Sequence, residues 1–279
     1  MAYWAYVSGV SDQPEDLTFE VPPGLALAPE AAEPVQPKDA ATVILLRDTA
    51  AGLEVFLQRR VAAMAFAAGM TVFPGGGVDK RDADASVSWA GPPARRWAEW
   101  FGCDESLARA LVCAAVRETF EESGVLLAGV GDAVVEDTSV YADARAALVS
   151  RELSLAAFLA EAGLTLRADL LRPWANWVTP SGEPRRYDTR FFVAALPAGQ
   201  RADGATTEAE SSGWQRAEDA LDDARTKRST LMPPTWITLH EIAEFGTTAA
   251  VLAEERTIDK ISPTLVRERG QVRIVLEGM

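Results

Sequence analysis

Two short apolar runs, separated by a polar turn, open the first regular part of the chain. Residues 41–47 read Ala-Thr-Val-Ile-Leu-Leu-Arg, and residues 53–59 read Leu-Glu-Val-Phe-Leu-Gln-Arg. Runs of this length, rich in β-branched and aromatic residues and bounded by turn residues, are typical of strands. Because residues 48–52 between them end in glycine, we expect a tight turn there and an antiparallel pair of strands.

The longest helical pattern covers residues 104–123. Its first half is apolar on every side, so only its last turns are expected to meet solvent. Asp104 suits the N-cap, and Gly124 suits the residue that ends the helix. Similar patterns predict helices at 95–102, 141–150, 154–162, 217–224 and 235–245, and strands at 174–180, 187–197 and 271–277. Strands and helices in this order predict a mixed sheet between helical layers.

The last turns of the long helix carry three acids on one side. At about 100° per residue, Glu118, Glu121 and Glu122 crowd one strip of roughly 100°. Like charges four residues apart repel, and acids near a helix C-terminus oppose the macrodipole. A divalent cation held by oxygen ligands would supply the missing counter-charge. Without further context, a solvated acidic face is the better explanation of such a pattern.

The context comes from a glycine loop upstream. Residues 73–82 read Phe-Pro-Gly-Gly-Gly-Val-Asp-Lys-Arg-Asp, and three glycines let the backbone approach a ligand closely. Taken alone, this loop is better explained as a hairpin turn. Together with Arg-Glu-Thr-Phe-Glu-Glu-Ser-Gly-Val at 117–125, it resembles the Nudix box, G-x5-E-x7-R-E-U-x-E-E-x-G-U, where U is a bulky apolar residue.

The box departs from that pattern in two ways. Forty residues separate Gly76 from Arg117, about 27 more than the pattern provides, and Thr119 fills the first U. The first Glu of the box falls on Asp82 when counted from the glycine, and on Arg109 when counted back from Arg117. The position of that acid is therefore left open, whereas the later glutamates are in place.

Further segments, at 55–59, 174–180, 186–192 and 231–234, fall in an order that resembles the coenzyme-A-diphosphatase-like branch of Nudix hydrolases, nucleoside diphosphate-linked moiety X motif 19. The resemblance covers roughly residues 40–250. It implies an α/β fold, the Nudix α/β/α sandwich with a mixed sheet. We expect an irregular Pro/Ala-rich arm at 1–39, a Nudix hydrolase domain at 40–250 with a helical insertion at 83–106, and a C-terminal extension at 251–279.

The resemblance also implies roles for individual residues. Arg117, Glu118 and Glu121 are the expected catalytic residues, with Glu118 as a further metal ligand or as the base and Arg117 holding the glutamates. The expected ligands of Mg²⁺ or Mn²⁺ are Glu118, Glu121, Glu122, a carbonyl near Gly75 or Gly76, and a downstream acid, Glu210 first and Glu208 second. The expected substrate-binding residues are Arg59, Gly75, Gly76 and Gly77.

The implied activity is metal-dependent hydrolysis of a diphosphate linkage in a nucleoside diphosphate derivative, by attack of water on phosphorus. Coenzyme A or an acyl-coenzyme A leads as substrate, followed by ADP-ribose, NAD(H) or a nucleotide sugar. A Nudix-fold sensor that binds a nucleotide without cutting it is the alternative from another class. All three glutamates are present, which favours the enzyme.

Composition narrows the partners and the compartment. A net charge of −14 argues against a surface that coats nucleic acid. The sequence has no run of 18 or more apolar residues, so we expect no membrane-spanning helix. Cys103 and Cys113 do not form a disulfide framework, and residues 1–10 lack the basic start of a secretory signal. We therefore expect a cytoplasmic enzyme acting on a small molecule. Contacts through the insertion or the arm would give a homodimer.

Overall fold

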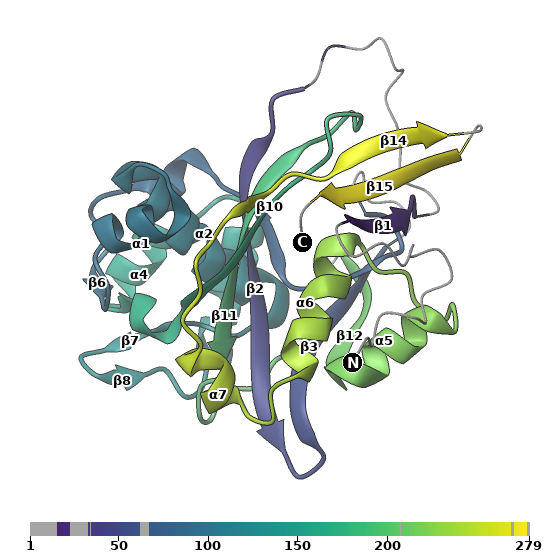
Figure 1. Ribbon diagram of the computed structural model, residues 1–279. Helices are drawn as coiled ribbons and strands as arrows, with labels where there is room; N and C mark the ends of the chain where they lie inside the picture. The colour runs from purple at the N-terminus through teal and green to yellow at the C-terminus, as the bar shows by residue number, and fades with distance from the viewer. Residues whose placement is uncertain are drawn as a thin grey trace.

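The computed structural model describes residues 16–22, 33, 35–61, 67–206, 208–268 and 271–277 (Figure 1). Helices lie on both sides of a mixed β-sheet, with α2 (Glu105–Ser123) behind it and α6 (Pro233–Ala243) in front in this view. This is the α/β/α arrangement that the sequence predicts.

The central sheet has eight strands among the described residues. They are β2 (Lys38–Thr49), β3 (Gly52–Arg60), β4 (Thr71–Val72), β5 (Gly75–Gly77), β10 (Arg172–Val178), β11 (Tyr187–Ala195), β12 (Ala209–Arg216) and β13 (Lys260–Ile261). The order is β12-β3-β2-β11-β10-β13, with β4 beside β3 and β5 beside β2. Because β2 runs parallel to β11 but antiparallel to β3 and β5, the sheet is mixed.

Both faces of the sheet are buried, which explains the nearly continuous apolar run in β2. Val43 and Leu45 pack into the core on the α2 side, whereas Ile44 and Leu46 pack into the core on the α6 side. All four are fully buried. Side chains alternate across a strand, so a strand covered on both faces needs apolar residues at successive positions.

The helices divide between the two sides of the sheet. On the α2 side lies α1 (Ala94–Phe101), and on the α6 side lie α5 (Ala217–Arg225) and α7 (Thr248–Ala253). The remaining helical segments are η1 (Lys80–Ala83), η2 (Ser139–Tyr141), α3 (Ala142–Val149), α4 (Leu155–Glu161) and η3 (Ala168–Leu170). Of the helices in these ranges, none is long and apolar enough to cross a membrane.

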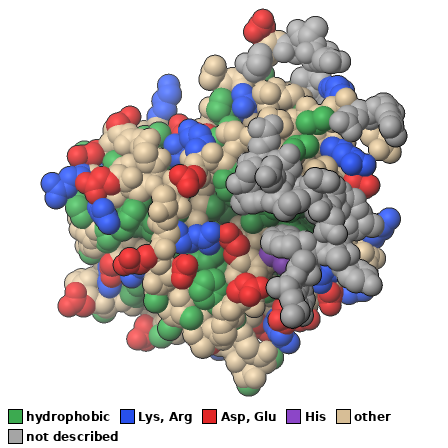
Figure 2. Space-filling view, viewed as in Figure 1, with side chains coloured by type: hydrophobic (Ala, Val, Ile, Leu, Met, Phe, Trp, Pro, Cys, Tyr) green, Lys and Arg blue, Asp and Glu red, His purple; other side chains and the backbone are tan. Residues whose placement is uncertain are grey.

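The surface mixes both signs of charge. On the face drawn in Figure 2, the described Asp and Glu side chains are interspersed with Lys and Arg. Extended nucleic-acid surfaces need clustered basic residues. No such cluster stands out among the described side chains on this face.

The predicted insertion is built into the core. Trp97 is fully buried and Phe101 is 4% exposed, and their rings lie 5.4 and 5.1 Å from that of Phe192 in β11. A second sheet, in the order β6-β9-β7-β8, links the insertion to later chain. Its strands are β6 (Trp89–Ala90), β7 (Ala128–Val130), β8 (Ala133–Val134) and β9 (Thr165–Arg167). Trp97 and Phe101 therefore belong to the core on the α2 side of the central sheet.

The N-terminal arm is not irregular throughout, and the expectation was wrong for β1 (Asp16–Glu20). This strand pairs antiparallel with β15 (Gln271–Glu277), which pairs with β14 (Thr264–Glu268). Phe19 lies edge-on to Trp236 of α6, with ring centroids 5.5 Å apart. Strands β1, β15 and β14 thus form one small sheet over α6.

The sequence pattern predicted no strand before the helix at 217–224, but the structure has one at residues 209–216. They form β12, the edge strand of the central sheet, paired with β3. Most of its residues are polar and none is fully buried, so no apolar pattern marks the strand, and its pairing depends largely on backbone hydrogen bonds. The other predicted helices and strands are present, with ends shifted by a few residues.

Candidate active site

The position of the three glutamates of α2 is fixed by the two ends of the helix and by its packing on the core. The Asp104 side chain caps its first turn, and Gly124 ends it with a left-handed φ of 73°. Phe120 is 1% exposed and faces the core. The opposite side of the last two turns therefore carries the three glutamates towards the glycine loop, as the helical spacing predicts.

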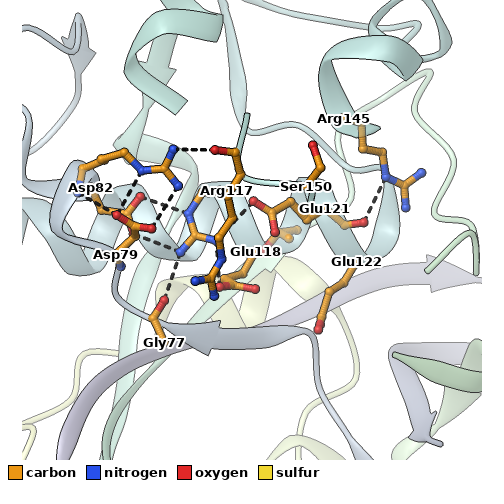
Figure 3. A network of polar contacts seen from close by, with 12 residues as sticks. Gly77, Asp79, Asp82, Arg117, Glu118, Glu121, Glu122, Arg145 and Ser150 are labelled. Carbon is orange, nitrogen blue, oxygen red and sulfur yellow. Dashed lines mark hydrogen bonds and ion pairs between the residues drawn. The ribbon is translucent and has the colours of Figure 1, made fainter. Parts of the chain in front are cut away.

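Arg117 lies at the centre of the polar network in Figure 3. Its guanidinium donates to both carboxylate oxygens of Asp82, at 3.0 and 2.9 Å, and to the Gly77 carbonyl at 3.0 Å. It also donates to Glu118 at 2.8 Å and to Glu121 at 3.2 Å. Burial works to lower the pKa of Arg117, but these carboxylates outweigh it and keep the pKa above its ordinary value. Arg117 therefore stays charged and holds two of the three glutamates.

Asp82 takes the box position that the sequence left open. It is 2% exposed, and besides Arg117 it accepts a hydrogen bond from the Asp79 amide at 2.8 Å. Arg109, the other residue that counting allowed, instead lies over the ring of Trp89 at 5.1 Å. The acid beside the box arginine is thus Asp82, brought there by the short helix η1.

The glycine loop closes directly onto the acids. The Gly75 amide donates to Glu122 Oε2 at 2.8 Å, and the Gln58 side chain donates to the same oxygen at 3.0 Å. A Cβ placed on Gly76 would lie 2.5 Å from Glu118 Oε1, closer than side-chain atoms approach. Glycine at position 76 is therefore required by this close approach.

The acids are short of positive charge. Burial raises the pKa of Glu118 to about 7, against the opposing charge of Arg117, and burial together with the charge of Glu118 raises that of Glu122 to about 8. Burial also raises the pKa of Glu121. Carboxylates that are costly to ionise without a further cation indicate a site for a positively charged group.

The chemistry of these donors fits a divalent cation. Carboxylates and backbone carbonyls are the hard oxygen ligands that Mg²⁺ and Mn²⁺ take. Arg117 holds Glu118 and Glu121, while Figure 3 shows Glu122 turned away from it. Across the described ranges, no three His, Cys, Asp or Glu side chains are grouped closely enough to hold one ion. Metal binding by these glutamates stays a prediction.

One cavity of about 580 Å³ joins the acids, the glycine loop and the sheet. Three kinds of side chain line it. The acids are Asp79, Glu118, Glu121, Glu122, Glu183 and Glu208; the basic residues are Lys38, Arg60, Arg81, Arg117, Arg151 and Arg185; and the larger apolar residues include Phe73, Trp177, Phe191, Met232 and Ile274. A ligand with both charged and apolar parts would match this lining.

Most predicted site residues line this cavity, but two do not. Arg59 and Glu210 have side chains 50% and 66% exposed, lie 3.8 Å from each other, and are outside the lining. Arg60 and Glu208 line it instead and form an ion pair at 2.9 Å. Alternation along β3 explains the difference, since residues 58 and 60 share one face and residue 59 points to the other. This alternation could have been predicted from the sequence, because Gln58 and Arg60 are two positions apart along the strand.

Other residues of the cavity gave no signal in the sequence. Glu183 lies in the connection between β10 and β11, where an acid is ordinarily exposed, yet it is 2% exposed. Trp177 reads simply as a core residue of a strand. Their place on the cavity wall depends on how distant segments pack together.

The layered sheet, the helix that ends in paired glutamates and the glycine loop define a Nudix hydrolase. The family model described as the NUDT19 Nudix domain matches residues 103–242, half of the chain, and the chain belongs to this family. Among curated proteins, it is similar to the acyl-coenzyme A diphosphatase NUDT19 of Xenopus laevis, at 25% identity over 69% of this chain and 60% of that protein. It is also similar to that of Gallus gallus, at 27% identity over 69% and 61%.

A solved structure supports the fold. The crystal structure of a Nudix hydrolase from Alicyclobacillus acidocaldarius matches with a TM-score of 0.68 and 27% identity, covering 80% of this chain and 98% of that one. The chain spans about three fifths of the length of the two curated relatives.

Proposed function

We propose that this protein hydrolyses the diphosphate linkage of a nucleoside diphosphate derivative, with coenzyme A or an acyl-coenzyme A as substrate. The observation that carries the proposal is the meeting of the three box glutamates, buried Arg117 and the glycine loop in one cavity. Two relatives are named acyl-coenzyme A diphosphatases, which supports this substrate class over other diphosphates.

In the proposed reaction, Glu118, Glu121, Glu122 and a carbonyl of the glycine loop would hold Mg²⁺ or Mn²⁺. The bound cation would neutralise charge on the phosphate oxygens and make water a better nucleophile. Glu118 takes the proton of the attacking water, a role worth roughly 10²–10⁴-fold in rate. Arg117 keeps the carboxylates in position by charge-assisted hydrogen bonds. Water adds to one phosphorus, the P–O–P bond breaks, and two phosphate monoesters leave.

Basic residues on the cavity wall support an anionic substrate. Arg60 is paired with Glu208 and Arg81 with Asp79. The side chains of Lys38, Arg151 and Arg185 also line the cavity. None of the three forms an ion pair among the described residues, although the charge of Arg151 acts to lower the pKa of Glu121. A substrate carrying a diphosphate and a further phosphate would supply ion-pair partners for them, and coenzyme A is such a molecule.

The test is hydrolysis of a panel of coenzyme A, acetyl-coenzyme A, ADP-ribose, NADH and a nucleotide sugar with Mg²⁺ or Mn²⁺. Mass spectrometry of products formed in ¹⁸O-labelled water identifies both the substrate and the attacked phosphorus. We expect cleavage of coenzyme A species into adenosine 3′,5′-bisphosphate and a phosphopantetheine, and loss of that cleavage in EDTA.

Two variants complete the test. Glu122→Gln keeps the size of the side chain but removes its charge, and we expect it to lower kcat by about 10²-fold or more. Glu99→Gln, on the exposed surface of α1 beside Arg96, is the matched control. Equal product formation by the wild type and Glu122→Gln would refute the proposal, as would no cleavage of any substrate.

A further inference from the structure

One wall of the cavity comes from the connection between β10 and β11, at residues 179–186. It packs against the C-terminal hairpin, since a Cβ on Gly182 would overlap the side chain of Leu265 in β14. Pro180 and Glu183 from this connection line the cavity, as does Pro263 just before β14. The hairpin thus covers a loop that would otherwise be open to solvent.

Glu183 is a buried acid whose hydrogen bonding is incomplete. It is 2% exposed, and its Oε1 has no hydrogen-bond partner within the part of the chain that the structure describes. Burial raises its pKa to about 7, against the opposing charge of Arg186. Buried polar groups are nearly always satisfied, so an unsatisfied one on a cavity wall points to a partner that binds there.

Trp177, which lines the same cavity, carries a second unsatisfied group. It is 3% exposed, and its Nε1–H finds no acceptor in the described structure. Its ring also borders a neighbouring cavity of about 490 Å³. Trp174, three residues earlier on β10, donates its Nε1–H to Glu241 at 2.8 Å and lines only that neighbouring cavity. The two indoles therefore differ in hydrogen bonding and in access to the active-site cavity.

We propose that Glu183 and Trp177 recognise the organic group attached to the diphosphate, by hydrogen bonds to a neutral group that carries both a donor and an acceptor. The carboxyl of Glu183 and the indole N–H of Trp177 supply the two sides of that recognition, and the tryptophan ring supplies an apolar surface beside them. The identity of the substrate rests on the proposed function. In coenzyme A, this chemistry occurs in the amides of the pantetheine arm and in the edge of adenine.

The experiment uses the two halves of coenzyme A as separate probes. Binding of 4′-phosphopantetheine and of adenosine 3′,5′-bisphosphate is measured by calorimetry with the full chain in Mg²⁺. Glu183→Gln alters the carboxyl at constant size, and Trp177→Phe removes the N–H but keeps an aromatic ring. Trp174→Phe is the matched control, because its N–H is already bonded within the protein. Thermal melting confirms that each variant is folded.

We expect Glu183→Gln and Trp177→Phe to weaken binding of the same half by roughly tenfold, and to leave the other half unaffected. Weakening confined to phosphopantetheine assigns the amides, and weakening confined to the bisphosphate assigns adenine. For hydrolysis of coenzyme A, KM rises more than kcat falls.

The inference is overturned if both variants bind both halves as the wild type does, or if Trp174→Phe has the same effect as Trp177→Phe. If the wild type cleaves coenzyme A and both variants bind the two halves as the wild type does, the inference is refuted but the proposed function is not. If the variants bind one half more weakly but the wild type cleaves no substrate, recognition by Glu183 and Trp177 is supported and the proposed hydrolase activity is refuted.

Discussion

Arg117 shows how much one side chain can organise. Its five hydrogen bonds reach Asp82, Gly77, Glu118 and Glu121, and so join the short helix η1, the glycine loop and the box helix. A lysine would keep the charge but could not satisfy these partners, since only the guanidinium has a planar fork of donors. The arginine of the box is thus a structural requirement of the acidic cluster.

A methyl group at position 76 should disrupt the same cluster. In Gly76→Ala, the new Cβ would meet the Glu118 carboxylate at 2.5 Å. We expect kcat to fall by roughly 10²-fold, because small displacements of reacting groups are costly. Gly213→Ala on β12 is the control, since a Cβ there meets nothing within 4 Å. Wild-type activity in Gly76→Ala would contradict the close approach.

Glu183 should make stability depend on pH. Its pKa is raised from 4.5 to about 7 in the folded protein, so the folded state binds more protons between these values. Its stabilising effect is complete below pH 4.5 and is lost as pH rises through about 7. We expect Glu183→Gln to gain about 1–3 kcal/mol relative to wild type between pH 4.5 and pH 8. Urea unfolding across this range measures the difference, and parallel pH profiles would count against it.

Among the elements, α2 illustrates how local signals and packing combine. Its cap at Asp104 and its end at Gly124 are local, whereas its apolar first half is stabilised by the sheet and by α1. Three acids in the last turns oppose the macrodipole, and Arg117 supplies the opposing charge. Packing and this ion pairing allow the helix to keep its acids where they face the cavity.

Removing the cap should weaken the protein without changing its chemistry. Asp104→Ala loses the hydrogen bond to the Leu107 amide, and we expect the free energy of unfolding to fall by about 1 kcal/mol. The cap is at the opposite end of α2 from the glutamates, so kcat at 25 °C stays near wild type. Asp143→Ala, which is exposed and makes no cap bond in α3, is the control. Denaturant unfolding that shows equal stability of both variants would disprove the role of the cap.

At the level of the whole molecule, β1 and the C-terminal hairpin of β14 and β15 close over the α6 side. Ile274 of β15 is 2% exposed and lines the active-site cavity, while Leu276 lines its neighbour. Both belong to the same core as Trp236 of α6. The C-terminal segment is therefore part of the core and of the cavity wall.

Because β15 is part of the core, shortening one of its buried side chains should lower the stability of the protein strongly. Ile274→Ala should lower the free energy of unfolding by about 2–4 kcal/mol, because it leaves a hole in a packed core. Val266→Ala, on the more exposed β14, should change it by less than about 0.5 kcal/mol. Chemical denaturation of both variants is the measurement. Similar stability of the two would mean that the hairpin is only loosely attached.

Much of the architecture could be predicted from local patterns in the sequence. The apolar runs of β2 and β3, the caps of α2 and the glutamates at its end all arise from residues within a few positions of each other. Turn, cap and periodicity preferences act over such short distances. They were enough to predict the layered fold and the acidic side of the box helix.

Distant contacts settled the rest. Asp82 meets Arg117 across 35 residues, Arg60 meets Glu208 across 148, and β1 pairs with β15 from the other end of the chain. β12 is a strand only because β3 offers it an edge. The burial of Glu183 depends likewise on the hairpin that covers it. Such features depend on which distant segments pack together in the folded chain. The residues next to each position in the sequence do not determine that packing.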